Sequence, residues 1–98
     1  MKVIASSNHT FGTAQAALKQ GARIARQGWN GKGMYLVLQP GGTTNHPLIE
    51  RGDDVEALPC IAMWTVNAEG RRACLHGWLA SQTDMLSEDW MIIADDDA

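Results

Sequence analysis

The chain has 98 residues, of which 45% are hydrophobic and 19% charged, and its formal net charge is −3. This length predicts one domain, and the charge balance argues against a surface for duplex nucleic acid, which usually shows a basic excess. No apolar run approaches the roughly 18 residues of a membrane span. The N-terminal apolar run is too short for a signal peptide. We therefore expect a cytoplasmic domain that contacts neither duplex nucleic acid nor a membrane.

The first predicted element is a short amphipathic helix in TFGTAQAALKQG, residues 10–21. Thr10 is a typical helix N-terminal cap. Apolar residues then recur at helical spacing from Phe11 to Leu18, and Gly21 provides a stop. This pattern predicts one helix with one buried face.

A β-hairpin is predicted next along the chain. The segment ARIARQGW, residues 22–29, alternates with a period of two, and GMYLVLQPGG, residues 33–42, is rich in residues that favour strands. The glycine-rich residues 28–33 would connect the two strands. The polar, turn-rich residues 40–57 then predict a long loop, a feature that in small domains is usually functional or disordered.

The second half of the chain predicts three more strands and a short helical segment. The strands are LPCIAMWTV, RRACLHGW and the final WMIIAD, and the helical turns lie in LASQTDMLSEDW. The fold class is therefore α+β, with the N-terminal helix packed on an antiparallel sheet of about five strands. We expect a single domain over residues 1–98 that ends in an acidic, disordered tail at about 95–98.

Ordinary catalytic and cofactor motifs are missing from the sequence. It has no GxSxG, HExxH or GxGxxG motif, and GWNGKG lacks the spacing of a phosphate-binding Walker loop. Cys60 and Cys74 form neither a CxxC pair nor a metal cluster with the scattered histidines, so buried free thiols are expected. The sequence predicts no catalytic residue, no metal site and no cofactor.

Two tryptophans on predicted turns are the candidate binding residues. Trp29 lies in the glycine-rich connection and Trp78 lies where the next hairpin ends. Indole rings can stack on a nucleobase, and nearby polar side chains could contact a phosphate. These polar candidates are Arg26, Asn30, Lys32, Ser81, Gln82 and Asp84. The alternatives remain open at this point: both tryptophans could cap the core, and SQTD could cap a helix. Trp64 and Trp90, inside strands, are assigned to the core.

The sequence resembles a family of small phage and prophage proteins, the second type of Thoeris anti-defence protein. The matching segments are FGTAQAALKQGARIARQGWNGKGMYL, LPCIAMWTV and GWLASQTDMLSEDW, which cover most of residues 11–93. The family's W-N and K positions fall on Trp29, Asn30 and Lys32. Its second tryptophan and its S-Q-x-D motif fall on the residues Trp78, Ser81, Gln82 and Asp84.

The resemblance implies a sponge that binds nucleotide immune signals in the host bacterial cytoplasm and does not cleave them. The implied ligands are the cyclic ADP-ribose isomers of Thoeris, with the cyclic di- and trinucleotides of CBASS as further candidates. It also implies a homotetramer with ligand pockets at subunit interfaces.

Two other functions stay open. One is an enzyme that degrades the same signals, with Asp84, Glu88, Asp89 and His76 as its acid–base candidates. The other is a structural or protein-interaction module, which would bind no small molecule.

Overall fold

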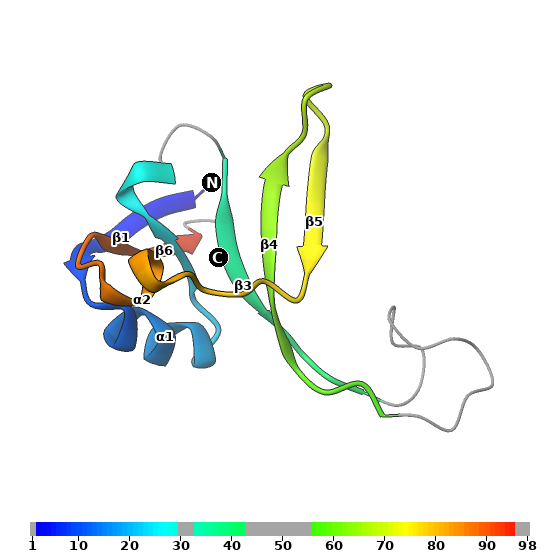
Figure 1. The fold of residues 1–98 in the computed structure, drawn as a ribbon, viewed down its shortest axis with the longest axis horizontal. Coiled ribbons are helices and arrows are strands. Elements are labelled where there is room, and N and C mark those ends of the chain that lie inside the picture. Colours follow the sequence, from blue (N-terminus) through cyan, green and yellow to red (C-terminus); the bar gives the residue numbers. More distant parts are fainter. Residues whose placement is uncertain (1, 30–32, 43–55, 96–98) are drawn as a thin grey trace.

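A computed structural model describes residues 2–29, 33–42 and 56–95, and it contains one six-stranded antiparallel sheet with the order β1-β6-β2-β3-β4-β5 (Figure 1). One longer helix, α1, and one short helix, α2, accompany the sheet. The elements in chain order are β1 (Lys2–His9), α1 (Phe11–Lys19), β2 (Arg23–Arg26), the 3₁₀ turn η1 (Gln27–Trp29), β3 (Tyr35–Gln39), β4 (Cys60–Val66), β5 (Arg72–His76), α2 (Gln82–Leu86) and β6 (Trp90–Asp95).

The predicted α+β class is confirmed, with one strand more than expected. The sequence predicts the helix as the first element, whereas the structure places β1 before it, paired with β6. The residues of β1 give little local indication of a strand, because only Val3 and Ile4 favour one and mostly polar residues follow them. Its strand conformation therefore depends on a partner from the other end of the chain. The register with β6 shifts between Ile4 and Ser6 and again between Ser6 and His9.

Helix α1 begins and ends where the sequence predicts. The hydroxyl of Thr10 accepts a hydrogen bond of 3.2 Å from the backbone N–H of Thr13, and Gly21 follows the last turn with a φ of 99°. A positive φ of this size favours glycine, which has no Cβ to clash. The helix buries Ala14 and Leu18 against the sheet.

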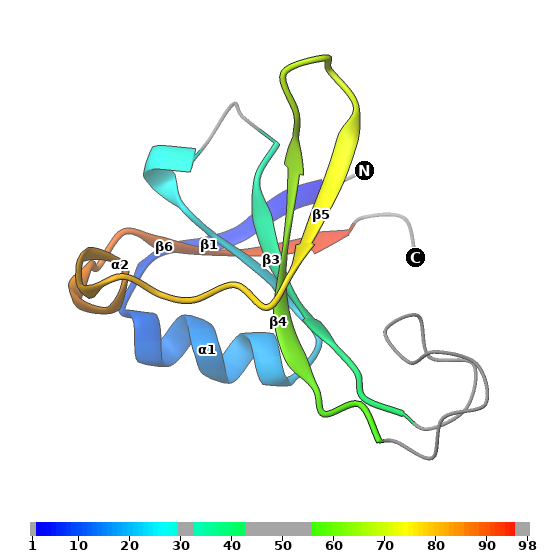
Figure 2. The ribbon, with the colours of Figure 1, turned by 45° about the vertical axis from the view of Figure 1, so that its right-hand side comes forward.

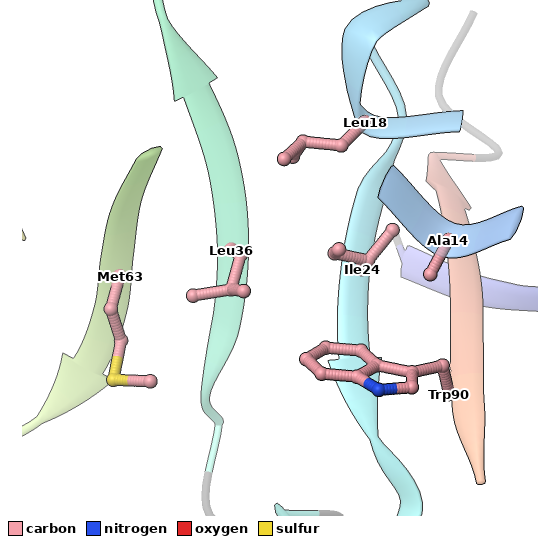
Figure 3. Packing of buried hydrophobic residues seen from close by; sticks show 6 residues of the cluster. All are labelled: Ala14, Leu18, Ile24, Leu36, Met63 and Trp90. Carbon is pink, nitrogen blue, oxygen red and sulfur yellow. The ribbon is translucent and has the colours of Figure 1, made fainter. Parts of the chain in front are cut away.

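The main core lies between α1 and one face of the sheet. Its buried side chains come from the helix and from four strands, and Figure 3 shows how Ile24, Leu36, Met63 and Trp90 lie opposite Ala14 and Leu18. Burial of each of the aliphatic side chains Leu18, Ile24 and Leu36 contributes roughly 1.5–3 kcal/mol to folding. Trp90 is fully buried, as predicted.

A second, smaller cluster lies on the opposite face of the sheet. It consists of Ala25, Tyr35 and Met91, and the half-buried Trp64 packs against it. The guanidinium carbon of Arg72 lies 4.9 Å from the Trp64 ring centroid. Since one cluster lies on each face, both faces of the sheet carry packed apolar residues.

The sheet is strongly twisted. Figure 2 shows that β4 and β5 cross the direction of β1 and β6.

The long loop and the acidic tail fall mostly outside the described residues. At the base of the loop, Gly42 and Ala57 exchange two backbone hydrogen bonds, of 3.0 Å and 2.8 Å, so the β3–β4 pair continues toward it. Residues 43–55 and 96–98 lie outside the described part of the chain, and β6 extends to Asp95. Cys60 and Cys74 are free and half-buried. In the described segments, no helix is long and apolar enough to cross a membrane.

Gly41 is required by the close approach of two backbones at this base. A Cβ at position 41 would overlap the carbonyl oxygen of Ala57. We expect Gly41→Ala to loosen the Gly42–Ala57 bridge, at a cost of about 1–3 kcal/mol, and to speed amide hydrogen exchange of Ala57. Gly12→Ala is the control, because its Cβ meets nothing closer than 4.0 Å and alanine favours a helix. Unchanged exchange at Ala57 would contradict this reading.

Candidate aromatic binding site

Three tryptophans from distant parts of the chain meet at one end of the main core. Trp29 comes from η1, Trp78 from the connection between β5 and α2, and Trp90 from the start of β6. Their ring centroids lie 5.5 Å apart for Trp29 and Trp90, 6.0 Å for Trp29 and Trp78, and 6.4 Å for Trp78 and Trp90. We call these three residues the tryptophan cluster.

Ring contacts, hydrogen bonds to backbone carbonyls and packing on the main core hold the tryptophan cluster in place. Trp90 is fully buried, lies 5.1 Å from the ring of Phe11, and donates its Nε1–H to the carbonyl oxygen of Asp84 at 2.9 Å. The backbone N–H of Trp78 donates to the carbonyl oxygen of Ile61 at 2.7 Å. Trp29 and Trp78 are half-buried and pack against the main core, so the core-capping alternative describes part of their role.

The ring angles limit how a base could be held. The planes of Trp29 and Trp78 meet at 80° and touch edge to face. Stacking a base between two rings requires them to be parallel and about 7 Å apart, twice the usual contact distance. These two rings therefore cannot sandwich a base within one subunit. Each can offer the part of its surface that the core leaves uncovered.

Arg26 joins the cluster's two sides through an ion-pair clamp. At the end of β2, its Nε donates to Oδ1 of Asp89 at 3.0 Å and its Nη1 donates to Oδ1 of Asp84 at 3.1 Å. The backbone N–H of Gln27 also donates to the Asp89 carbonyl at 3.1 Å. This Arg26–Asp84–Asp89 clamp fixes η1, and with it Trp29, against the α2 region. Its formal charge is −1, from one guanidinium and two carboxylates.

Helix α2 begins with a capping box, as the helix-cap alternative for SQTD predicted. The Ser81 hydroxyl accepts from the backbone N–H of Asp84 at 3.1 Å, and Asp84 Oδ2 accepts from the backbone N–H of Ser81 at 3.0 Å. Asp84 therefore satisfies the helix start and binds Arg26 with the same carboxylate. Gln82, the first residue of α2, is exposed beside this cap.

The ionisation of Asp84 reflects these contacts. Burial opposes its charge, but the backbone N–H and hydroxyl of Ser81 and the guanidinium of Arg26 favour the carboxylate. The net effect holds the pKa of Asp84 below its usual range. A carboxylate stabilised in this way is a poor proton acceptor, which weakens its candidacy as a catalytic base.

The structure brings together six of the eight predicted site residues and leaves two undescribed. The residues placed around the tryptophan cluster and the clamp are Arg26, Trp29, Trp78, Ser81, Gln82 and Asp84. Asn30 and Lys32 lie outside the described residues. The sequence does not indicate that Asp89 is a partner of Arg26 or that Trp90 forms the floor of the site. The adjacent pair Asp89-Trp90 was visible, but no local pattern indicated its partner 63 positions away.

The structure divides the four acid–base candidates of the alternative enzyme into two pairs. Asp84 and Asp89 are engaged by Arg26, whereas Glu88 and His76 are exposed. Within the described segments, no group of three metal-ligating side chains gathers. What the geometry offers is an aromatic surface with polar groups at its border.

The fold and the site thus define a small α+β protein with a cluster of one buried and two half-buried tryptophans that is braced by an ion pair. The family model described as the Thoeris anti-defense 2-like domain matches residues 9–93, and the chain belongs to this family. It is 33% identical over 87 residues to Thoeris anti-defense 2 of Bacillus phage SP01, covering 87% of this chain and 94% of that relative. The expected family resemblance is confirmed, and the chain is a Thoeris anti-defence protein of this family.

We expect the contacts of the Asp84 carboxylate with Ser81 and Arg26 to make stability depend on pH. Because the pKa of Asp84 is lower in the folded than in the unfolded state, its contribution is present above about pH 4 and is lost as the pH falls through the folded pKa. Urea midpoints should therefore fall between about pH 5 and pH 2. Asp84→Asn should flatten this dependence and lower stability at pH 7 by about 1 kcal/mol. Glu88→Gln is the control; equal pH profiles for the wild type and Asp84→Asn would contradict the clamp.

We also expect Trp29 to contribute to stability as well as to any binding. Trp29→Ala removes a ring that packs against Trp90 and both apolar clusters, and we expect a loss of about 2–4 kcal/mol. Trp29→Phe keeps an aromatic ring and should lose less than half as much. Urea unfolding followed by circular dichroism measures both. Equal stability of Trp29→Ala and the wild type would show that the ring does not cap the core.

Proposed function

We propose that this protein is a phage anti-defence sponge that binds nucleotide immune signals and sequesters them without cleavage. The proposed ligands are the cyclic ADP-ribose isomers of Thoeris, with the cyclic di- and trinucleotides of CBASS as further candidates. The observation that carries the proposal is the tryptophan cluster, which presents two half-buried indoles beside exposed polar groups in a member of the Thoeris anti-defense 2-like family. The proposed site of action is the host bacterial cytoplasm, where such signals would be made.

The proposed contacts fall into two groups. Trp29 and Trp78 would each provide a stacking surface, and Ser81 and Gln82 would provide polar contacts together with Asn30 and Lys32. Arg26 and Asp84 neutralise each other, so we assign them to positioning the ring of Trp29. A positively charged side chain outside the clamp, for which Lys32 is our candidate, would then face the phosphates of the ligand.

The affinity that a sponge needs favours a pocket shared between subunits. A sponge needs nanomolar binding, about −12 kcal/mol, and one stacked base supplies roughly 1–3 kcal/mol. Since the perpendicular rings of one subunit cannot enclose a base, the opposite face must be covered by something else. A second subunit would provide it, which agrees with the proposed homotetramer and its interface pockets.

The engagement of two of the acid–base candidates by Arg26 supports binding over catalysis at this site. The clamp engages Asp84 and Asp89, and the backbone N–H and hydroxyl of Ser81, together with the Arg26 guanidinium, hold the pKa of Asp84 below its usual range. A degrading enzyme would need a group able to accept a proton near neutral pH. Sequestration needs no such group.

The test is recovery of intact ligand. The purified protein is incubated with a cyclic ADP-ribose isomer, freed from unbound ligand and heated, and the released nucleotide is identified by mass spectrometry. We expect the intact molecule in stoichiometric amount. Trp78→Leu should reduce the retained amount at least tenfold, whereas Leu79→Ser, at the neighbouring 89% exposed position, should not change it. A cleaved product would favour the enzyme, and no retention of any cyclic nucleotide would favour the interaction module.

A further inference from the structure

Trp29 packs against both apolar clusters of the sheet. On the side of the main core it meets the ring of Trp90, and the clamp fixes the end of β2 from which it extends. On the opposite face it packs against the second cluster, which consists of Ala25, Tyr35 and Met91. The orientation of the Trp29 ring therefore depends on contacts from both faces of the sheet.

Tyr35 is held at its ring and at its hydroxyl. It is the first residue of β3 and is buried. Its hydroxyl accepts a hydrogen bond of 2.7 Å from Nη2 of Arg72, and the guanidinium carbon of Arg23 lies 5.3 Å from its ring centroid. Hydrogen bonds from a charged donor are stronger than those between neutral groups. The second cluster therefore presents a fixed surface to Trp29.

Arg72 makes its contact with Tyr35 from two strands away. It lies on β5, Tyr35 lies on β3, and β4 runs between them (Figure 1). In the strand registers, Tyr35 faces Trp64 and Trp64 faces Cys74. Arg72 is two residues before Cys74, so its side chain leaves the same face of the sheet. Its guanidinium lies over the Trp64 ring, at 4.9 Å from the centroid, and one side chain thus connects three neighbouring strands.

The same strands carry the segments that present the two outer tryptophans. β3 follows the connection in which Trp29 lies, and β5 leads to Trp78. The backbone N–H of Trp78 is bonded to the carbonyl oxygen of Ile61 on β4. A contact that holds β5 against β3 therefore also restrains how Trp29 and Trp78 lie relative to each other.

We propose that Arg72 and Tyr35 are positioning residues of the aromatic binding site, which act on the ligand through Trp29 and do not touch it. The Arg72–Tyr35 bond holds the second cluster in place, and that cluster holds the Trp29 ring in the orientation in which it stacks on a base. The clamp restrains Trp29 from the side of α2, and this bond restrains it from the opposite face of the sheet. The positioning role rests on the proposed function for its ligand.

A direct contact between the charge of Arg72 and the ligand phosphates is the competing explanation, and Tyr35→Phe separates the two. This substitution removes the hydroxyl but keeps the ring, the contact with Arg23 and the charge of Arg72. We expect it to weaken binding of a cyclic ADP-ribose isomer roughly three- to tenfold in isothermal titration calorimetry. Arg72→Met keeps an unbranched side chain beside Trp64 and should weaken binding by a similar factor.

The double variant shows whether the two residues act through one bond. Because each substitution removes the same hydrogen bond, Tyr35→Phe combined with Arg72→Met should bind no more weakly than the weaker single variant. Arg71→Met is the matched control, since it removes the same charge at the neighbouring exposed position and should keep the wild-type affinity. Losses that multiply in the double variant would overturn the proposal. Weakened binding by Arg72→Met with wild-type binding by Tyr35→Phe would overturn it as well.

The indole N–H signals of the four tryptophans provide a readout without ligand. Each ring gives one signal in a ¹H–¹⁵N NMR spectrum, and Trp29→Phe assigns that of Trp29. Tyr35→Phe and Arg72→Met should shift this signal and lower its heteronuclear NOE, which reports motion on the ps–ns timescale. The NOE of Trp90, whose N–H is bonded within the fold, should not change. A general loss of stability would leave the signal of the folded Trp29 in place, so an unchanged signal in both variants would overturn the proposal.

The NMR signal and the affinity together distinguish this positioning role from the proposed function. If the wild type binds no cyclic nucleotide but both variants loosen the Trp29 ring, the sponge is overturned and the bracing of Trp29 by Arg72 and Tyr35 stands. If the wild type binds and both variants bind as tightly with an unchanged Trp29 signal, the positioning role alone is overturned.

Discussion

The indole of Trp90 is the contact on which the rest of this structure depends. Its ring lies beneath Trp29 and Trp78 and beside Phe11 of the helix, and its Nε1–H binds the carbonyl oxygen of Asp84. One fully buried side chain thus connects helix α1, turn η1, the β5–α2 connection and α2. The surface presented by the two outer tryptophans keeps its shape because this residue supports both of them.

The Arg26–Asp84–Asp89 clamp fixes the orientation of η1, which packing on Trp90 alone does not determine. The tryptophan contacts alone would permit η1 to rotate about the core, because apolar packing is not directional. Two hydrogen bonds from one guanidinium to two carboxylates fix the end of β2 relative to α2. Since both carboxylates are committed to one guanidinium, the clamp carries a net charge of −1, and recognition of an anionic ligand would require positive charge from outside the clamp.

Local patterns predicted the elements well, and contacts between distant residues escaped them. The Thr10 and Ser81 caps, the stop at Gly21 and the alternation in β2 and β3 are all encoded within a few residues, so the sequence was sufficient to place them. Strand β1 and the Arg26 clamp depend on partners more than 50 positions away, and single-sequence patterns carry no such information. The perpendicular rings of Trp29 and Trp78 were likewise invisible, because a motif gives residue types and not their angles.

The position of β6 within the sheet has a consequence for how the chain folds. The last described strand lies between β1 and β2, the first two strands in sequence. During synthesis the β2–β3–β4–β5 region can assemble from neighbours, but its junction with β1 stays open until β6 has emerged. Closure of such a long loop slows folding. Trp90 arrives with that strand, so the aromatic surface and the completed sheet form in the same late step.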